Sequence, residues 1–245
     1  MLQSGTRRMI TLHGFGTAFG LPDPSPFVIK TELHLRMAGL EYRKMRADPR
    51  KGPRGKIPWM DDAGVIVPDS TLIRKHIETT HGFDFDTSLS PEQKGVAWSV
   101  EKMMEDHLYW LIVIERWLDP ANFEKGPRVF FDEVPALLRP IVLAMVGRQV
   151  RRTLHGHGIG RYTSDELGML GREAATAIAR VLGDKPWMMG QEPCGLDATA
   201  LAFIASAACP HFNGPLRASF DAQPNLGAYV QRGMARWCPE FATAS

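Results

Sequence analysis

One stretch constrains the fold of this chain more than any other: RGKIPWMDDAGVIVPDSTLIRKHIE, which runs from Arg54 to Glu78. Two short apolar runs flank an Asp-Asp-Ala-Gly turn and a helical pattern follows, so the stretch predicts a β-hairpin and then a helix. The first strand carries Pro58, which removes a backbone donor and restricts that strand to an edge or a bend. Asp69 and Ser70 open the helix, which places an acid and a hydroxyl at its mouth.

These two features together predict a binding site for a short peptide. A cis bond between Ile57 and Pro58 costs only about 0.5–1 kcal/mol, and it would leave the backbone of Ile57 to pair with an extended peptide. At the helix mouth, Asp69 and Ser70 offer a carboxylate, a hydroxyl, backbone N–H groups and the positive end of the helix dipole. This set suits the ammonium and the carboxylate of one amino-acid end. Glutathione is such a peptide.

The residues before this stretch predict a βαβ unit. Their patterns indicate a strand over 9–14, a helix over 27–38 and a strand over 40–46. Ser25 stands as the N-cap of that helix, and Pro26 occupies its first position, where the missing N–H costs nothing. With the hairpin and a helix over 71–80, this predicts an α/β domain at residues 1–82.

From Ser90 the pattern becomes helical. A capping box, Ser-Pro-Glu-Gln, opens a long helix that we expect to reach about Leu118. No strand is predicted after Val67, and Asp197 is expected to hold the start of a nearly all-apolar helix. Residues 90–245 are therefore predicted as an all-α domain, with further helices over 131–149, 163–182, 198–208 and 226–236.

Composition excludes several classes of protein. The chain has 245 residues, 44% of them hydrophobic, which is enough for a real core. Its net charge of +2 is too small to indicate nucleic-acid binding, and the basic run from Arg43 to Lys56 lacks interleaved aromatic residues. Three cysteines without a spacing signature favour a reducing compartment. No apolar run approaches the roughly 20 residues of a membrane span, and no signal peptide is evident. We therefore expect a cytoplasmic location.

These segments resemble a known family. KGPRGKIPWMDDAGVIVPDSTLIRKHIETTHG is similar to the second half of the thioredoxin-like domain of glutathione transferases. SPFVIKTELHLRMAGLEY is similar to the first helix and second strand of that domain. EDHLYWLIVIERW, HGHGIGRYTSDEL and GLDATALAFI resemble the failed-axon-connections and metaxin branch. The resemblance implies a thioredoxin-like N-terminal domain, an all-α C-terminal domain and glutathione between them as co-substrate, without a metal or organic cofactor.

The resemblance also implies which residues bind glutathione. Ile57, beside Pro58, would pair with the cysteinyl backbone. Asp69 and Ser70 would hold the γ-glutamyl end. Either Lys56 or Lys44 would approach the glycyl carboxylate, so the implied binding residues are Ile57, Pro58, Asp69, Ser70, Lys56 and Lys44.

Catalysis requires the glutathione thiol to ionise. A free thiol titrates near pH 8.5, and a helix N-terminus or a hydroxyl donor lowers that pKa. Ser25 stands where relatives keep Ser or Cys, so the resemblance implies Ser25 as the catalytic donor. An ordinary N-cap role is the alternative for Ser25, and Thr17 is the only other hydroxyl in the long loop before the helix. The absence of cysteine from residues 1–82 argues against disulfide exchange.

The leading functional interpretation is a homodimeric glutathione transferase that conjugates glutathione to small hydrophobic electrophiles. A non-catalytic metaxin-like binding protein on the same scaffold and a glutathione-dependent peroxidase are the alternatives. No metal site is predicted, since His155 and His157 lack further ligands at useful spacing. His157 or Arg161 could instead touch substrate in the cleft between the domains. Tyr109 and Trp110 fit either the electrophile pocket or the core.

Overall fold

A four-stranded mixed sheet forms the N-terminal part of the protein. The computed structural model describes residues 9–242, so residues 1–8 and 243–245 of the two predicted domains lie outside the described residues. The strand order is β2-β1-β3-β4, with β1 parallel to β2 and antiparallel to β3, and β3 antiparallel to β4. The strands are β1 (Ile10–Gly14), β2 (Tyr42–Arg46), β3 (Trp59–Asp62) and β4 (Val65–Pro68).

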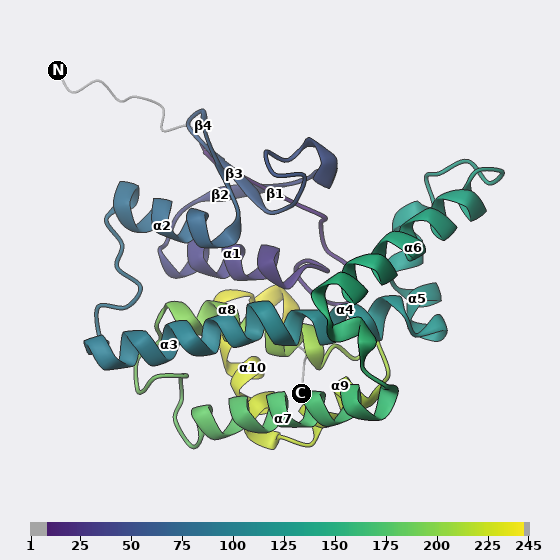
Figure 1. The fold of residues 1–245 in the computed structure, drawn as a ribbon. Helices are drawn as coiled ribbons and strands as arrows, with labels where there is room; N and C mark the ends of the chain where they lie inside the picture. The colour runs from purple at the N-terminus through teal and green to yellow at the C-terminus, as the bar shows by residue number, and fades with distance from the viewer. Residues whose placement is uncertain (1–8, 243–245) are drawn as a thin grey trace.

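Two helices, α1 (Pro26–Met37) and α2 (Ser70–His81), lie between the sheet and the rest of the molecule (Figure 1). The connection from β1 through α1 to the parallel strand β2 is the predicted βαβ unit. Apolar side chains of the sheet and both helices share one core, made by Ile10, Leu12, Val28, Leu35, Met60, Val67, Ile73, Ile77 and Phe85. The arrangement confirms the predicted thioredoxin-like domain.

Strand register brings three distant segments to one end of the sheet. His13 of β1 lies opposite Trp59 of β3, and Trp59 lies opposite Pro68 of β4. Since β3 is antiparallel to both neighbours, its first residue lies beside the last residues of β1 and β4. The loop that leaves β1, the Ile57–Pro58 pair and the start of α2 therefore meet at the same end. The Ile57–Pro58 bond is cis, as predicted, but Pro58 precedes β3 and is not part of it.

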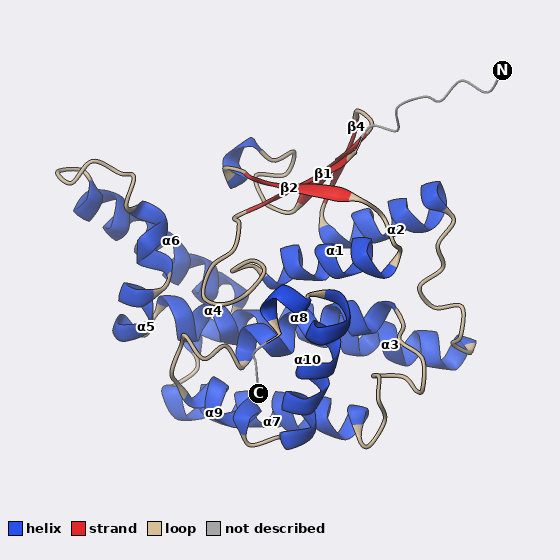
Figure 2. Ribbon diagram, turned by 180° about the vertical axis from the view of Figure 1, so that it is seen from behind, coloured by secondary structure: helices blue, strands red, loops and turns tan. Residues whose placement is uncertain are grey.

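The remainder of the described chain is helical (Figure 2). Its α-helices are α3 (Pro91–Met103), α4 (Tyr109–Trp117), α5 (Pro120–Lys125), α6 (Arg139–His157), α7 (Ser164–Leu182), α8 (Gly195–Ala207), α9 (Pro215–Asp221) and α10 (Pro224–Trp237). Every residue of α8 is buried, and α8 packs against α1 and α10. This confirms the predicted all-α C-terminal domain. Within the described residues, we find no helix with both the length and the apolar character that crossing a bilayer requires.

Asp197 organises the start of the buried helix α8, as predicted. Its carboxylate accepts hydrogen bonds from the backbone N–H groups of Cys194 and Met188, both at 2.8 Å. The hydroxyl of Tyr229 donates a third bond at 2.7 Å. A fully buried acid is tolerated here because each carboxylate oxygen is satisfied.

The predicted position of α6 was wrong. The helix begins at Arg139, whereas the sequence pattern began it at Phe131. Pro140 stands in its first turn, where proline is tolerated, and the interior position assigned by the prediction would have removed a helical hydrogen bond. The helix also extends past residue 149, where the prediction ended it, to His157. His155 and His157 therefore lie in its last turn.

The long helix predicted after Ser90 has a π-helical turn in its middle. This turn, Met104–Leu108, joins α3 to α4. A π turn inserts a residue into the helical ladder and is often found at functional sites. The short helices α5 and α9 were not predicted, because six or seven residues carry too little periodicity to be recognised.

A buried network of charges holds the two parts of the molecule together. Lys30 of α1 is fully buried, and its ammonium lies 3.1 Å from Glu101 and 2.5 Å from Glu105. Arg74 of α2 lies 3.4 Å from the other oxygen of Glu101 and pairs with Asp86. Because Glu101 belongs to α3, one carboxylate links both sheet helices to the helical domain.

The charges of this network keep Glu101 ionised. Burial by itself raises the pKa of that carboxyl, but Lys30, Arg74 and Lys102 outweigh burial and lower the pKa to about 2. Because the folded protein lowers this pKa, the ionised carboxylate contributes its full stabilisation at pH values above 4.5, the ordinary pKa of a glutamate. That contribution is lost as the pH falls from there toward about 2.

Replacing Lys30 by Met should therefore destabilise the protein strongly. The substitution keeps a similar volume but removes the fully buried cation that contacts both Glu101 and Glu105, and breaking a buried pair costs about 3–5 kcal/mol. Urea unfolding of wild type and Lys30→Met at neutral pH measures this difference. Lys75→Met is the matched control, because its pair with Glu78 lies at the surface and should contribute less than about 1 kcal/mol. Equal losses for the two variants would contradict the role of Lys30.

Candidate functional site

The candidate site lies where the sheet end meets the start of α2. The backbone N–H of Asp69 donates to the carbonyl of Pro58 at 3.1 Å, which ties the helix mouth to the residue before β3. Ile57 is half-buried, and its own N–H and C=O make no backbone hydrogen bond within the described residues. Bare main-chain groups beside a strand are what an added peptide strand requires.

Asp69 has an unusual backbone conformation. Its φ of 72° and ψ of 136° lie outside the helical and strand regions, and such angles in a residue other than glycine cluster at binding sites. The carboxylate stays exposed and accepts a bond from the N–H of Thr71 at 2.9 Å. Ser70 follows as the first residue of α2 and is buried. A charged acid and the free N–H groups of a helix start therefore face the same space.

The hydroxyl of Ser25 is not used to cap its helix. Ser25 holds the N-cap position of α1, but its side chain makes no capping hydrogen bond. Only its carbonyl serves the helix, by accepting the N–H groups of Val28 and Ile29 at 3.1 Å each. Ser25 therefore holds the predicted N-cap position through its backbone alone, and its half-buried hydroxyl makes no capping bond.

Asp23 is a site residue that sequence reasoning missed. It is fully buried, and its carboxylate accepts the backbone N–H groups of Phe15, Gly16 and Ser25, each at 3.0 Å. Burial raises the pKa of Asp23 to about 7, although these N–H groups favour the charged form. Asp23 thus fixes the loop after β1 against the start of α1. The Asp-Pro pair at 23–24 was the available signal, because Asp before Pro favours a turn.

The loop after β1 also contacts the helical domain. Phe19 stacks on His211, with ring centroids 4.8 Å apart, and meets Phe212 edge-on at 5.0 Å. The thiol of Cys209 donates to the carbonyl of Phe19 at 3.4 Å. Thr17 is exposed in the same loop. The loop therefore closes one side of the space between the two domains.

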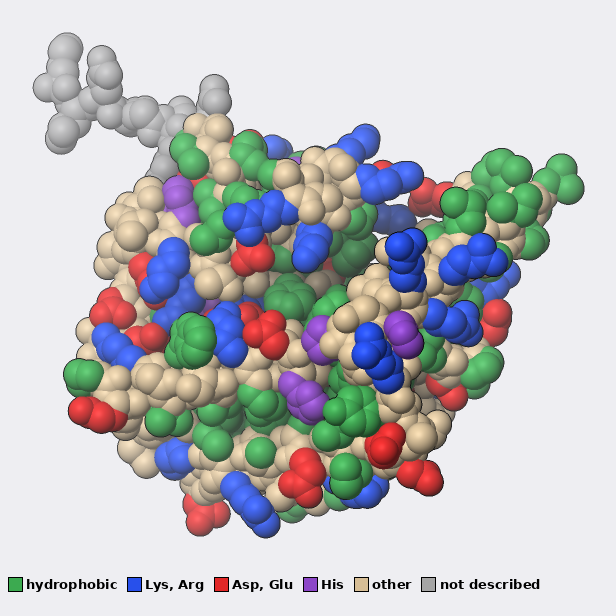
Figure 3. All heavy atoms as spheres, in the orientation of Figure 1, with side chains coloured by type: hydrophobic (Ala, Val, Ile, Leu, Met, Phe, Trp, Pro, Cys, Tyr) green, Lys and Arg blue, Asp and Glu red, His purple; other side chains and the backbone are tan. Residues whose placement is uncertain are grey.

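The helical side of this space comes from α4 and α6. Tyr109 packs edge-on against Phe27 of α1, with centroids 5.0 Å apart, so it belongs to the domain interface. Trp110 contacts His157 of α6 at 4.7 Å. Arg161 is exposed and donates to the carbonyl of His155 at 3.1 Å. In Figure 3 the surface is hollowed between the sheet domain and the projecting α6.

The two candidate lysines lie in different places. Lys56 is exposed in the loop beside Ile57. Lys44 lies on β2, which β1 separates from β3 and β4, and its ammonium donates to Pro22 O at 2.6 Å and to Glu32 at 2.7 Å. Lys56 is therefore exposed next to Ile57 in the chain, whereas the ammonium of Lys44 already bonds to Glu32 and to the carbonyl of Pro22.

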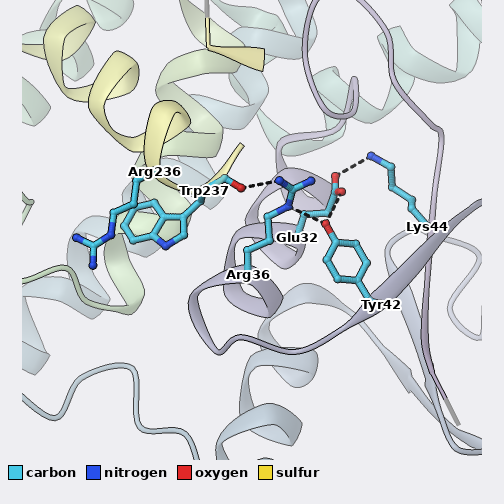
Figure 4. Close-up of a pocket in the computed structure, with 6 residues that line it drawn as sticks. All are labelled: Glu32, Arg36, Tyr42, Lys44, Arg236 and Trp237. Carbon is cyan, nitrogen blue, oxygen red and sulfur yellow. Dashed lines mark hydrogen bonds and ion pairs between the residues drawn. The ribbon is translucent and has the colours of Figure 1, made fainter. Parts of the chain in front are cut away.

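A separate cavity opens on the β2 side of the sheet. It has a volume of about 560 Å³ and is bounded by α1, β2 and the end of α10 (Figure 4). Lys44 of its lining pairs with Glu32, and Arg36 donates to Tyr42 and to the carbonyl of Trp237. The residues that line it are Glu32, Arg36, Tyr42, Lys44, Arg236 and Trp237.

Gly14, the last residue of β1, should not tolerate a side chain. A Cβ there would lie 2.7 Å from the Asp23 carboxylate and 2.8 Å from Val28, and such overpacking costs about 1–3 kcal/mol. Gly95, inside α3, has open space at that position, so Gly95→Ala should stabilise by up to about 1 kcal/mol. Urea unfolding of both alanine variants checks the opposite signs. A neutral Gly14→Ala would mean that the Asp23 contact is not tight.

Comparisons with known proteins agree with this geometry. Residues 26–122 match the family described as glutathione S-transferase N-terminal domain, and residues 171–233 match the glutathione S-transferase C-terminal domain. A beta-etherase structure from Sphingobium sp. strain SYK-6 superposes with a TM-score of 0.67 at 18% identity, covering 95% of this chain and 98% of that chain. At that identity the likeness concerns the fold alone.

Curated relatives extend over nearly the whole chain. Failed axon connections of Drosophila melanogaster is 28% identical over 95% of this chain, which spans only 59% of that protein. Isoprene-epoxide–glutathione S-transferase of Rhodococcus sp. (strain AD45) is 28% identical, covering 91% of this chain and 97% of that protein. Metaxin-1 of Macaca fascicularis is 24% identical, covering 90% of this chain and 73% of that protein. Taken with the two domains and the site between them, these matches show that the chain belongs to the glutathione S-transferase superfamily and resembles its metaxin-like branch.

Proposed function

We propose that this protein is a glutathione transferase that joins the sulfur of glutathione to a small hydrophobic electrophile. The observation that carries the proposal is the meeting of three segments at one sheet end. These are Ile57, whose backbone N–H and C=O make no backbone hydrogen bond, the start of α2 at Asp69 and Ser70, and Ser25, whose hydroxyl makes no capping bond. Together they offer a main-chain pairing edge, an acid beside helix N–H groups, and a hydroxyl donor.

Each part of glutathione has a matching group at this site. The cysteinyl backbone would pair with the N–H and C=O of Ile57. The γ-glutamyl carboxylate suits the first N–H groups of α2 and the hydroxyl of Ser70, while its ammonium suits the exposed carboxylate of Asp69. Lys56, beside Ile57, is the better placed of the two lysines for the glycyl carboxylate.

Ser25 would favour the ionised thiol. The thiol proton leaves to solvent, and the hydroxyl of Ser25 then donates a hydrogen bond to the thiolate, which lowers the thiol pKa. The sulfur attacks an electrophilic carbon and forms a C–S bond. If the electrophile is an epoxide, the C–O bond breaks and the ring oxygen takes a proton from water. The name of the Rhodococcus relative supports a small epoxide as substrate.

The cysteines support conjugation over disulfide exchange. All three lie in the helical domain and are buried, and burial raises the pKa of Cys194, Cys209 and Cys238. Raised thiol pKa values reduce the thiolate fraction that disulfide exchange needs. Glutathione would therefore supply the reactive sulfur.

A non-catalytic binding role is the second candidate. The similarity to Failed axon connections and metaxin-1 favours it. So do the exposed apolar side chains just before and within the first turns of α6, where Leu137 is 92% exposed, Ile141 60% and Met145 66%.

A glutathione-dependent peroxidase would use the same thiolate, and turnover of organic hydroperoxide instead of epoxide would identify it. The proposal includes a homodimer and a cytoplasmic location.

Removing the charge of Asp69 should weaken glutathione binding. Asn tolerates the positive φ of this position, so Asp69→Asn removes the ammonium partner without forcing the backbone to change. Loss of a charge-assisted bond worth about 1.5–3 kcal/mol predicts roughly 10- to 150-fold weaker binding by calorimetric titration. Asp165→Asn, on an exposed first turn of α7, is the control and should bind as wild type does. Wild-type protein that fails to bind millimolar glutathione would reject the transferase proposal.

Ser25→Ala should raise the pKa of the bound thiol. In wild type, the ultraviolet absorbance of the thiolate should titrate below the free value of about 8.5, and the alanine variant should return toward that value with slower epoxide conjugation at neutral pH. Thr17→Ala separates the two hydroxyls of this region. A shift caused by Thr17→Ala and not by Ser25→Ala would transfer the donor role to Thr17.

A further inference from the structure

A cluster of metal-type ligands lies at the other end of α2. The Nε2 atoms of His76 and His81 each lie 2.8 Å from the same oxygen of Asp62, and the ligand atoms of the three residues lie within 4.8 Å of one another. Asp62 ends β3, while His76 and His81 belong to the last two turns of α2. All three side chains are largely buried, with 9–15% of their surface exposed.

We propose that Asp62, His76 and His81 form a binding site for a divalent transition-metal cation of the zinc class. Two imidazole nitrogens and one carboxylate oxygen are a ligand set that zinc accepts, with water completing a tetrahedron. The site lies far from the glutathione end, because α2 runs its whole length from Ser70 to His81. It is therefore independent of the proposed transferase activity.

The charge around the cluster suits a cation. Asp62 forms ion pairs only with these two histidines among the described residues, and no lysine or arginine neutralises it. With both imidazoles neutral, the cluster carries one negative charge.

A second contact fixes one ligand ring. Nδ1 of His76 lies 3.4 Å from the hydroxyl of Thr80, one helical turn later. Metal-binding histidines commonly use their second nitrogen in this way, which orients the ring. If Nδ1 carries the proton, Nε2 of His76 turns a lone pair toward the Asp62 oxygen. In the other tautomer Nε2–H donates to Asp62, and a bound cation would take the place of that proton.

The geometry needs little adjustment to admit zinc. Bonds of about 2.0–2.1 Å place tetrahedral ligand atoms roughly 3.3 Å apart. The two N–O separations of 2.8 Å would therefore open by about half an ångström. The two histidine nitrogens, which lie within 4.8 Å of each other, would move to the same spacing through side-chain rotation. A bound ion would connect the β3–β4 hairpin to the end of α2 and so stabilise the N-terminal domain.

The sequence alone did not reveal this site. His76 and His81 have the H-x4-H spacing of zinc-finger histidines, but no cysteine pair precedes them in the sequence, and only the sheet-to-helix packing brings Asp62 to them. The one histidine pair that drew attention, His155 and His157, lies at the exposed end of α6. That pair provides a matched control.

Titration of metal-free, glutathione-free protein with Zn²⁺ tests the proposal. We expect about one bound zinc per chain and a thermal unfolding midpoint that rises with zinc. The conservative variants His76→Gln and His81→Gln should each weaken binding by at least tenfold and abolish the zinc-dependent rise. Cobalt should produce the visible spectrum of a tetrahedral site in wild type and not in these variants.

A control variant and a test of folding distinguish loss of the zinc site from unfolding of the protein. The double variant His155→Gln/His157→Gln should bind zinc as wild type does. Far-ultraviolet circular dichroism establishes that the Gln variants at 76 and 81 are folded before titration, and Asp62→Asn supplies a second test if either is not. Absence of zinc binding by wild type, or binding lost only in the 155/157 variant, would overturn the proposal.

Discussion

The buried ammonium of Lys30 is the interaction on which the arrangement of the two domains depends. It lies on α1, the helix that also carries Ser25, and it pairs with Glu101 and Glu105 of the helical domain. A charge without solvent requires partners at close range, because its desolvation penalty is several kcal/mol. Small shifts of one domain against the other would separate these charges. The network therefore fixes the position of α1 and α2 against the helical domain. The β1–α1 loop, α4 and α6, which border the candidate site, are placed relative to one another by this arrangement.

Within that frame the candidate site is assembled by strand register and by one buried acid. Register places the ends of β1 and β4 beside the start of β3. Asp23 then holds the loop after β1 through three backbone N–H groups, one of them belonging to Ser25. The site is made mainly of backbone groups and helix ends, so the proposed binding of glutathione would depend on conformation as much as on side chains.

Several site features could be predicted from the sequence because they are local. Pro58 limits the backbone around it, and Asp69–Ser70 marks a helix start, so the hairpin, the helix and the peptide-binding chemistry follow from neighbouring residues. Asp23 was missed because its three partners become neighbours only when the loop folds back on itself. Lys44 was assigned to glutathione, but the parallel pairing of β2 with β1 places it on the far side of β1 and beside Glu32.

The helical domain shows the same division. The helices α7, α8 and α10 lie close to their predicted ranges, whereas the prolines near residue 135 obscured the start of α6. The π turn between α3 and α4 has no sequence signature that we recognised; it packs against α8, and its Glu105 is buried.

The sequence by itself therefore determined the order and type of most elements, the superfamily resemblance and the Ile57–Pro58 and Asp69–Ser70 features on which the binding proposal rests, since all of these are encoded in short-range patterns. Only the tertiary structure decided that the hydroxyl of Ser25 takes no part in capping its helix, that Lys44 pairs with Glu32, and that Asp62 meets two histidines of α2. Those outcomes depend on contacts between residues far apart in the chain, and short-range patterns carry no information about which distant groups come within bonding distance.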